Sequence, residues 1–273
     1  LDCAVDLSQT LQKSGSDLHF EIGDALEVLE NIHNEHGIRR ILSHEETGNS
    51  WSYDRDKKVI QWCKEKMINW IEYPNNGIIR RLKNRDQWKR ERDSRMRTPL
   101  SETPMFSQSI IFDGQIPGIT DLNLTPRPLV SRPEPGEDAA LRRLRLFLDE
   151  DSKKYNWSIS SPTLSRKHGS VLSPYLTTGV ISMRRIVQET NSKIKYIRKN
   201  KSVIDCHSEW IQSLTSFRQR LAWRCHFIQK LEMESNLDLV AQNPAIEEKL
   251  DRKLDPEKFI RWKEGRTGWP FFD

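Results

Sequence analysis

The feature that most constrains the fold is a hydrophobic periodicity that changes several times within the first 73 residues. Polar and apolar residues alternate over residues 18–22, which is typical of a β-strand. From Ala25 to Ile32 the apolar residues recur at helical spacing, after a plausible N-cap at Asp24 and before a stop at Gly37. The pattern therefore predicts a strand followed by a helix.

The same order repeats further along the chain. Residues 38–42 are predicted to form a second strand, residues 53–67 a helix and residues 68–73 a third strand. Strands that alternate with helices at this spacing predict a parallel α/β layer connected by right-handed crossovers. A helix predicted around residues 5–11 has no strand before it.

A proline-rich stretch separates this layer from the rest of the chain. Residues 98–135 hold seven of the 13 prolines and show no persistent apolar period. Because a structureless run of this length is improbable inside one compact domain, we place a domain boundary here. The sequence beyond residue 136 predicts an all-α domain with two apolar stripes: Leu141, Leu144, Phe147 and Leu148, and then Ile211, Leu214, Phe217, Leu221, Ile228 and Leu231.

Positive charge is concentrated in one segment between these parts. The chain carries 44 Lys and Arg against 39 Asp and Glu, and residues 80–97 alone hold nine basic and three acidic residues. Such a patch can bind a polyanion by releasing counterions. A solvated basic helix is the simpler explanation of the same residues.

Composition excludes several classes of protein. No run approaches the roughly 18 consecutive apolar residues of a membrane helix, and the first residues show no secretion signal. The four cysteines form no C-x-x-C pair, so we predict neither a disulfide scaffold nor a thiolate metal site. We therefore expect an intracellular protein without a membrane span or a bound metal, in the cytoplasm or, in a eukaryote, in the nucleus or an organelle.

One predicted helix, residues 208–232, carries aromatic and arginine side chains along one stripe. Phe217, Arg220, Arg224 and Phe227 follow one another at i, i+3, i+7 and i+10. Such a stripe can stack against planar rings and pair with phosphates. A core helix with arginines at its rim is the alternative.

A second candidate site lies between His168 and Leu176, where a glycine and two serines precede a helix that begins near Pro174. Backbone N–H groups and hydroxyls at a helix N-terminus suit a phosphate or a pyrophosphate. An ordinary helix cap explains the same residues.

Several longer motifs carry a resemblance to a known family. They are SHEETGNSW (43–51), NGIIRRL (76–82) and RDQW (85–88) in the first half, and SVLSPYL (170–176), LAWR (221–224) and WKEGRTGWP (262–270) in the second. In this order they resemble motifs of the DNA photolyase and cryptochrome family. The resemblance spans nearly the whole chain.

The resemblance implies a light-driven flavoprotein. The expected fold is an α/β Rossmann-like domain over 1–97, an interdomain linker over 98–135, and part of an all-α FAD-binding domain over 136–273, with both domains incomplete. FAD is the expected cofactor, and an antenna chromophore of the folate or deazaflavin type is a further option. UV-damaged DNA is the expected partner: in photolyases, an electron from excited reduced flavin splits a pyrimidine dimer that has been flipped out of the duplex.

Matched positions carry the family's roles over to this chain. Contacts to FAD are expected from six residues: Tyr155, Gly169, Ser170, Leu172, Ser173 and Phe217. Trp223 corresponds to the aromatic residue that packs on the damaged pyrimidines, where stacking replaces the partners that a flipped base gives up. Arg220 and Arg224 are expected beside it, facing the cofactor or the DNA. The resemblance assigns no catalytic residue.

Arg220 departs from the family pattern, because cyclobutane-dimer photolyases typically have Glu at this position. An arginine cannot reproduce the hydrogen bonds of a carboxylic acid to the dimer. A cryptochrome-like photoreceptor without repair activity is therefore the alternative to a photolyase, and a cofactor-free binding module is a third hypothesis. Because the rest of the FAD domain would follow Asp273, we expect the isolated chain to bind FAD weakly or not at all. Its oligomeric state is left open.

Overall fold

The N-terminal part contains two parallel strands, β1 (Arg40–His44) and β2 (Asn69–Tyr73). The computed structural model describes residues 1–106, 116–126, 132–250 and 253–273. Helix α3 (Ser50–Glu65) connects the strands, which confirms the predicted strand–helix–strand order and parallel pairing. A larger Rossmann-like sheet around this pair stays a prediction.

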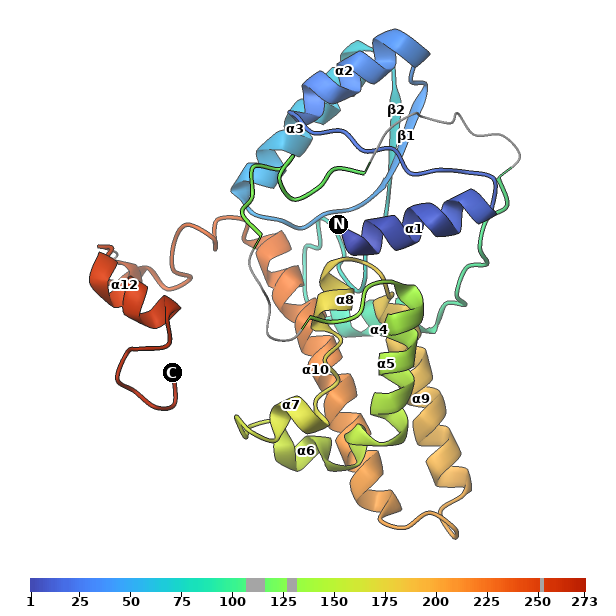
Figure 1. Cartoon of the computed structure of the whole chain (residues 1–273), viewed down its shortest axis with the longest axis vertical. Coiled ribbons are helices and arrows are strands. Elements are labelled where there is room, and N and C mark those ends of the chain that lie inside the picture. Colours follow the sequence, from blue (N-terminus) through green and yellow to red (C-terminus); the bar gives the residue numbers. More distant parts are fainter. Residues whose placement is uncertain (107–115, 127–131, 251–252) are drawn as a thin grey trace. The chain divides into compact units, whose positions relative to one another are not determined.

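Local signals set the ends of the helices beside these strands. The Asp24 carboxylate accepts a hydrogen bond from the Leu26 N–H and caps α2 (Ala25–His36), which ends at Gly37, a residue with a φ of 71°. Asn49 caps α3 in the same way, so that α3 begins three residues earlier than predicted. Figure 1 shows α2 and α3 together beside the strands. A small core lies between them, formed by Val59, Trp62, Cys63 and Ile68.

The strand predicted over residues 18–22 is wrong, because this segment belongs to no strand in the structure. The described strands β1 and β2 pair with each other, and alternation stabilises a strand only where a sheet buries one face. Ile22 is 54% exposed. Asp17 instead accepts hydrogen bonds from its neighbour Leu18 and from Ser8 of α1 (Asp2–Lys13), which tie the segment to that helix.

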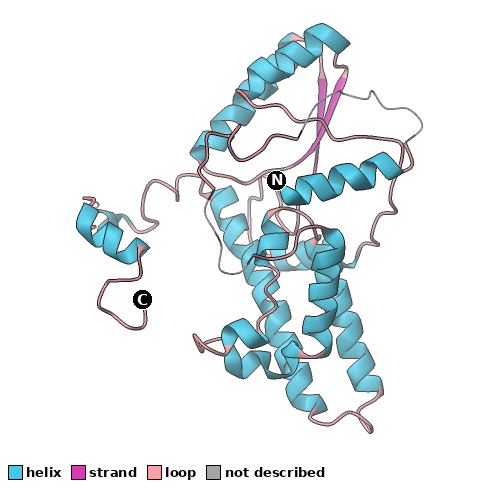
Figure 2. Cartoon of the chain, in the orientation of Figure 1, coloured by secondary structure: helices cyan, strands magenta, loops and turns pink. Residues whose placement is uncertain are grey.

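Helices form all of the regular structure described after residue 97 (Figure 2). The long ones are α5 (Glu137–Asp149), α9 (Met183–Lys199) and α10 (His207–Met233). Short ones connect them: η1 (Asp151–Lys154), α6 (Tyr155–Ser158), α7 (Ser165–His168) and α8 (Ser173–Thr177). The prediction of an all-α second part is therefore confirmed for the described residues.

One apolar core holds these helices together. Phe147 of α5, Ile186 of α9 and Leu214 of α10 are fully buried in it. Trp88 and Met96 of α4 (Trp88–Arg97) belong to the same core, so the basic segment packs against the helical part of the chain. The linker prediction falls partly on residues 107–115 and 127–131, outside the described residues, and the domain boundary within it stays a prediction.

The chain separates into two compact units, Leu1–Met233 and Glu234–Asp273. The second unit contains α11 (Pro244–Glu247) and α12 (Pro256–Lys263), and the Asp255 carboxylate caps α12. Three of its large aromatic side chains, Trp269, Phe271 and Phe272, are 69–78% exposed. None of the described helices combines the length and the apolar character needed to cross a membrane.

Candidate functional site

Helix α10 carries four of the predicted site residues, and they lie on different sides of the helix. Phe217 is 3% exposed and points into the core, whereas Trp223 is 52% exposed. Successive residues of an α-helix turn by about 100°, so positions 217 and 223 differ in direction by about 120°. The predicted aromatic–arginine stripe is also split, since Phe217 at one end is buried and Phe227 at the other end is 62% exposed.

The buried face completes a cluster of three aromatic rings. The Phe217 ring lies 4.6 Å from that of Phe147 and 5.6 Å from that of Tyr155, with centroid distances and tilts typical of edge contacts. Burial raises the pKa of the Tyr155 hydroxyl, and the nearby positive charge of Arg220 opposes that rise. Leu172, which is 1% exposed, belongs to the same core. Three of the expected FAD contacts, Tyr155, Leu172 and Phe217, are thus buried in one apolar core, where the rings of Tyr155 and Phe217 are in contact.

On the open face, Arg220 stacks on Trp223. The guanidinium carbon of Arg220 lies 4.6 Å from the centroid of the Trp223 ring, within the range of a cation–π contact. This contact leaves about half of the indole accessible for a second planar group. The structure therefore joins Arg220 and Trp223 into one exposed planar surface.

The segment before α8 is fixed by a half-buried arginine, Arg143. The Arg143 guanidinium donates to the Ser170 carbonyl at 2.9 Å and to the Gly169 carbonyl at 3.3 Å, and it also pairs with Asp151. A Cβ on Gly169 would lie 2.4 Å from the Ser165 carbonyl oxygen, so no larger residue fits there without a shift of backbone. Ser173 begins α8 and is exposed. The predicted contact of Gly169, Ser170 and Ser173 with a cofactor stays a prediction.

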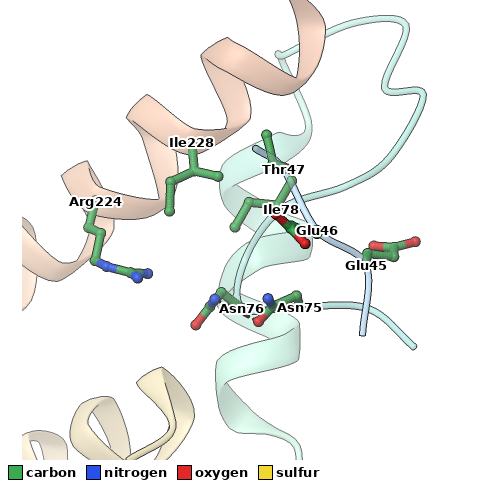
Figure 3. A pocket seen from close by; sticks show the side chains of 8 residues that line it. All are labelled: Glu45, Glu46, Thr47, Asn75, Asn76, Ile78, Arg224 and Ile228. Carbon is green, nitrogen blue, oxygen red and sulfur yellow. Dashed lines mark hydrogen bonds between the residues drawn. The ribbon is translucent and has the colours of Figure 1, made fainter. Parts of the chain in front are cut away.

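A pocket that the sequence analysis did not predict lies at the carboxyl ends of the two strands (Figure 3). The loop after β1 supplies Glu45 and Thr47, the loop after β2 supplies Asn75 and Asn76, and α10 supplies Arg224. Its volume is about 140 Å³. Parallel strands end at the same edge of a sheet, which is where such folds place ligands. This rule, applied to the polar residues after each predicted strand, could have found the pocket.

Opposite charges line the pocket without being paired. In Figure 3 the Arg224 side chain extends from α10 toward Asn76, and Glu45 lies on the other side. One guanidinium nitrogen of Arg224 and one carboxylate oxygen of Glu45 are buried with no hydrogen-bond partner in the described part of the chain. Because an unsatisfied buried polar group costs about 1–3 kcal/mol, this arrangement suits a polar ligand or ordered water. Arg224 therefore faces this pocket.

Beyond Arg224, the last turns of α10 dock onto the segment that follows β2. The Gln229 amide makes two hydrogen bonds to the backbone of Ile79, and the His226 ring nitrogen Nδ1 accepts one from Arg85 at 2.7 Å. Arg80 pairs with Glu72 of β2 and, at 3.6 Å, with Glu232 of α10. These contacts fix α10 against the strands.

The basic segment 80–97 divides into inward and outward side chains. Arg80, Arg85, Arg92 and Arg95 are buried or half-buried, and their guanidinium groups reach carboxylates, carbonyls or the His226 ring. Only the remaining five, Arg81, Lys83, Lys89, Arg90 and Arg97, are exposed. The segment therefore holds helices together as well as offering charge to a polyanion.

Comparisons with known proteins show which proteins this chain is similar to. The family model described as the FAD-binding domain of DNA photolyase matches residues 217–273. A deoxyribodipyrimidine photo-lyase of Halobacterium salinarum is 25% identical over the whole chain, which covers 57% of that relative. A cryptochrome DASH of Arabidopsis thaliana is 24% identical over the whole chain, which covers 49% of it. The chain thus spans about half the length of these relatives.

Solved structures show the same fold. A class III photolyase from Agrobacterium tumefaciens superposes with a TM-score of 0.74 at 20% identity, over 98% of this chain and 56% of that one. A Synechocystis cryptochrome gives a TM-score of 0.75 at 18% identity, with the same coverage. The chain is thus similar in sequence to DNA photolyases and cryptochromes, shares their fold over nearly its whole length, and matches the FAD-binding domain of DNA photolyase over residues 217–273.

Proposed function

We propose that the protein to which this sequence belongs is a light-driven, FAD-dependent DNA photolyase that repairs UV-induced pyrimidine dimers. One observation carries the proposal: the segment that matches the photolyase FAD-binding domain begins at Phe217. It therefore includes the helix face on which Arg220 and Trp223 form an exposed planar surface. An open indole beside a guanidinium is suited to stack on an unpaired base and to attract phosphate.

The expected site residues include the apolar, hydroxyl and positively charged side chains that FAD binding requires. FAD, when bound, would supply the light absorption and the electron transfer. Tyr155, Leu172 and Phe217 would form the apolar wall behind the ring system, since they share one core. The hydroxyls of Ser170 and Ser173 would donate to phosphate oxygens, and Arg220 would add a positive charge near Tyr155. Trp223 would hold the flipped base by stacking.

An antenna chromophore is part of the same proposal. A Sulfolobus tokodaii photolyase is described as holding two FAD molecules, with the implication of a novel light-harvesting cofactor; it superposes with a TM-score of 0.64 at 19% identity. In this chain the pocket of Glu45, Asn76 and Arg224 offers unpaired polar atoms at the edge of the sheet. Its volume of about 140 Å³ accommodates one polar ring of a chromophore and not a whole folate or flavin. Chromatography of chromophores released by heat would identify a second pigment.

A cryptochrome-like photoreceptor is the second candidate, and Arg220 favours it. Cryptochromes appear among the relatives at almost the same identity as the photolyase. The Arg220 side chain is engaged with the Trp223 ring, where a dimer-binding carboxylic acid is expected in cyclobutane-dimer photolyases. A stacked cation can attract an anionic lesion but cannot accept hydrogen bonds from it.

One experiment separates the two. The protein is expressed from its complete reading frame, its absorption spectrum is recorded, and the sample is then illuminated with thymine-dimer DNA under reducing conditions. Flavin bands with loss of dimers support a photolyase. Flavin bands with intact dimers support the photoreceptor, and a colourless protein rejects both in favour of a cofactor-free binding module.

A further inference from the structure

Helix α9 and the loop after it hold a second concentration of positive charge. Residues 184–201 contain seven basic residues and one acidic residue, Glu189. This net charge of +6 equals that of segment 80–97, although the whole chain carries only +5. The rest of the chain is therefore net acidic.

The structure separates these cations by what they contact. Lys193 pairs with Asp149 of α5 at 2.6 Å, and Arg184 donates to the Pro99 carbonyl. Four others are exposed and make no ion pair or hydrogen bond with the described residues, and we call them the α9 basic strip: Lys195, Arg198, Lys199 and Lys201. The opposite face of α9 is buried through Ile186, Ile194 and Ile197, so the strip is fixed on the outer side of the helix.

Stabilisation of the α9 helix explains the presence of only two of the four basic residues in the strip. Cations in the last turn interact favourably with the helix dipole, which accounts for Arg198 and Lys199. Lys195 lies before that turn and Lys201 lies after the helix, so the dipole does not require them. In segment 80–97, four of nine basic residues turn inward, and two of them, Arg80 and Arg85, contact α10. The share of exposed cations is nearly the same in the two segments, four of seven in 184–201 and five of nine in 80–97, but the four of the strip fall within seven consecutive residues.

We propose that the α9 basic strip binds the phosphate backbone of duplex DNA. Side chains three and four apart on a helix are about 5–6 Å from one another, and duplex DNA carries one charge per 1.7 Å of its axis, so several phosphates fall within reach of the strip. Tyr196, 57% exposed within the strip, adds a hydroxyl that can donate to a phosphate. The choice of DNA among polyanions rests on the proposed function.

The strip is distant from the Arg220–Trp223 surface. Helices α9 and α10 pack side by side, and the chain returns between them through a short loop, so the C-terminal end of α9 lies near the start of α10 at His207 (Figure 1). At 1.5 Å per residue, Trp223 is about 24 Å further along α10. At about 3.4 Å per base pair, this is the length of about seven base pairs. The strip would therefore bind DNA whether or not a lesion is present.

Salt-dependent binding of undamaged DNA tests the proposal. A fluorescently labelled 30-base-pair duplex is titrated with the 273-residue chain in the dark, at several KCl concentrations, with anisotropy as the readout. The strip variant carries Lys195→Gln, Arg198→Gln and Lys199→Gln. The control carries Arg39→Gln, Lys58→Gln and Lys64→Gln, which removes the same charges from exposed positions elsewhere. Because neither light nor flavin nor a lesion is used, a failure here leaves the photolyase proposal to its own test.

The strip variant is expected to lose at least about tenfold in affinity at 0.1 M KCl, and its slope of log Kd against log [KCl] should shrink by about 2–3. The control should change less than about threefold. A second variant, Lys195→Gln with Lys201→Gln, keeps the cations of the last turn and should shrink the slope by about 2. Equal losses in strip variant and control, or wild-type binding without salt dependence, would overturn the proposal. Loss of binding to vesicles with 30% phosphatidylserine, with DNA binding intact, would assign the strip to a membrane surface instead.

Discussion

The contact between Gln229 and Ile79 gives the sharpest test of how α10 is held. The Ile79 N–H donates to Oε1 of Gln229 at 2.7 Å, and Nε2 of Gln229 donates to the Ile79 carbonyl at 3.0 Å. One side chain thus satisfies both backbone groups of one residue, as a neighbouring strand would. Gln229 is fully buried. The substitution Gln229→Met removes both hydrogen bonds while it keeps an unbranched side chain of similar length.

The expected loss of stability follows from the two groups left behind. An unsatisfied buried donor or acceptor costs about 1–3 kcal/mol. Ile79 is only half-buried, so the lower part of that range applies, and the two groups together should lower the free energy of unfolding by about 2–4 kcal/mol. The apolar methionine is well suited to the site, which is why the loss is assigned to hydrogen bonds and not to a cavity.

Urea unfolding of the chain, followed by tryptophan fluorescence, measures this loss, since Trp88 and Trp210 are buried in the core that α10 completes. The matched control is Gln61→Met on α3, where an exposed glutamine donates only to Glu65. It should shift stability by less than about 0.5 kcal/mol. A Gln229→Met variant as stable as the control would refute the view that this side chain docks α10.

Other predictions concern pH, cofactor and lesion. Burial, and then the charges of Arg85 and Lys230, lower the pKa of His226, so the neutral imidazole is favoured in the folded protein. The free energy of unfolding should therefore fall as the pH drops below about 6.5. The variant His226→Gln should reduce this fall, measured as urea midpoints between pH 7.5 and 5.5. In the complete protein, Trp223→Ala should weaken lesion binding by about 1–3 kcal/mol while flavin absorbance persists, and unchanged affinity would reject the stacking role. Replacing Ser170 and Ser173 together by Ala should lower flavin occupancy, because charge-assisted hydrogen bonds of about 1.5–3 kcal/mol each are lost; full occupancy would reject their assignment.

Periodicity and capping residues were enough to predict most of the elements. Asp24 and Gly37 were predicted as the ends of α2, and the structure confirms both, whereas the cap of α3 at Asn49 was not predicted. The prediction of a strand over residues 18–22 was wrong because a strand must pair with a neighbouring strand, and the alternation of polar and apolar residues does not identify that neighbour. The core residues of α5 and α10 were predicted for the same reason that the helices were: their apolar spacing is regular.

The site was predictable only where a motif resembled a family. Arg220 and Trp223 are three residues apart on one helix, so their contact follows from local spacing, but its exposure depends on which face of α10 the core occupies. The pocket at Glu45 was missed since its residues come from three separate segments, which the parallel pairing of β1 and β2 and the docking of α10 bring together. Likewise, the charge count singled out segment 80–97, although four of its nine basic side chains turn inward and make contacts within the protein.

The packing of α10 explains why the N-terminal layer matters for the proposed site. The core side of the helix carries Phe217, the open side carries Trp223, and the side toward the strands carries Gln229. Because these positions are fixed at about 100° per residue on one rigid helix, a rotation that frees Gln229 also turns Trp223. The α/β layer therefore does more than cover the helices: it sets the direction in which the Arg220–Trp223 surface faces. A substitution at Gln229, about 9 Å along the helix from Trp223, should consequently weaken lesion binding in the complete protein without touching DNA.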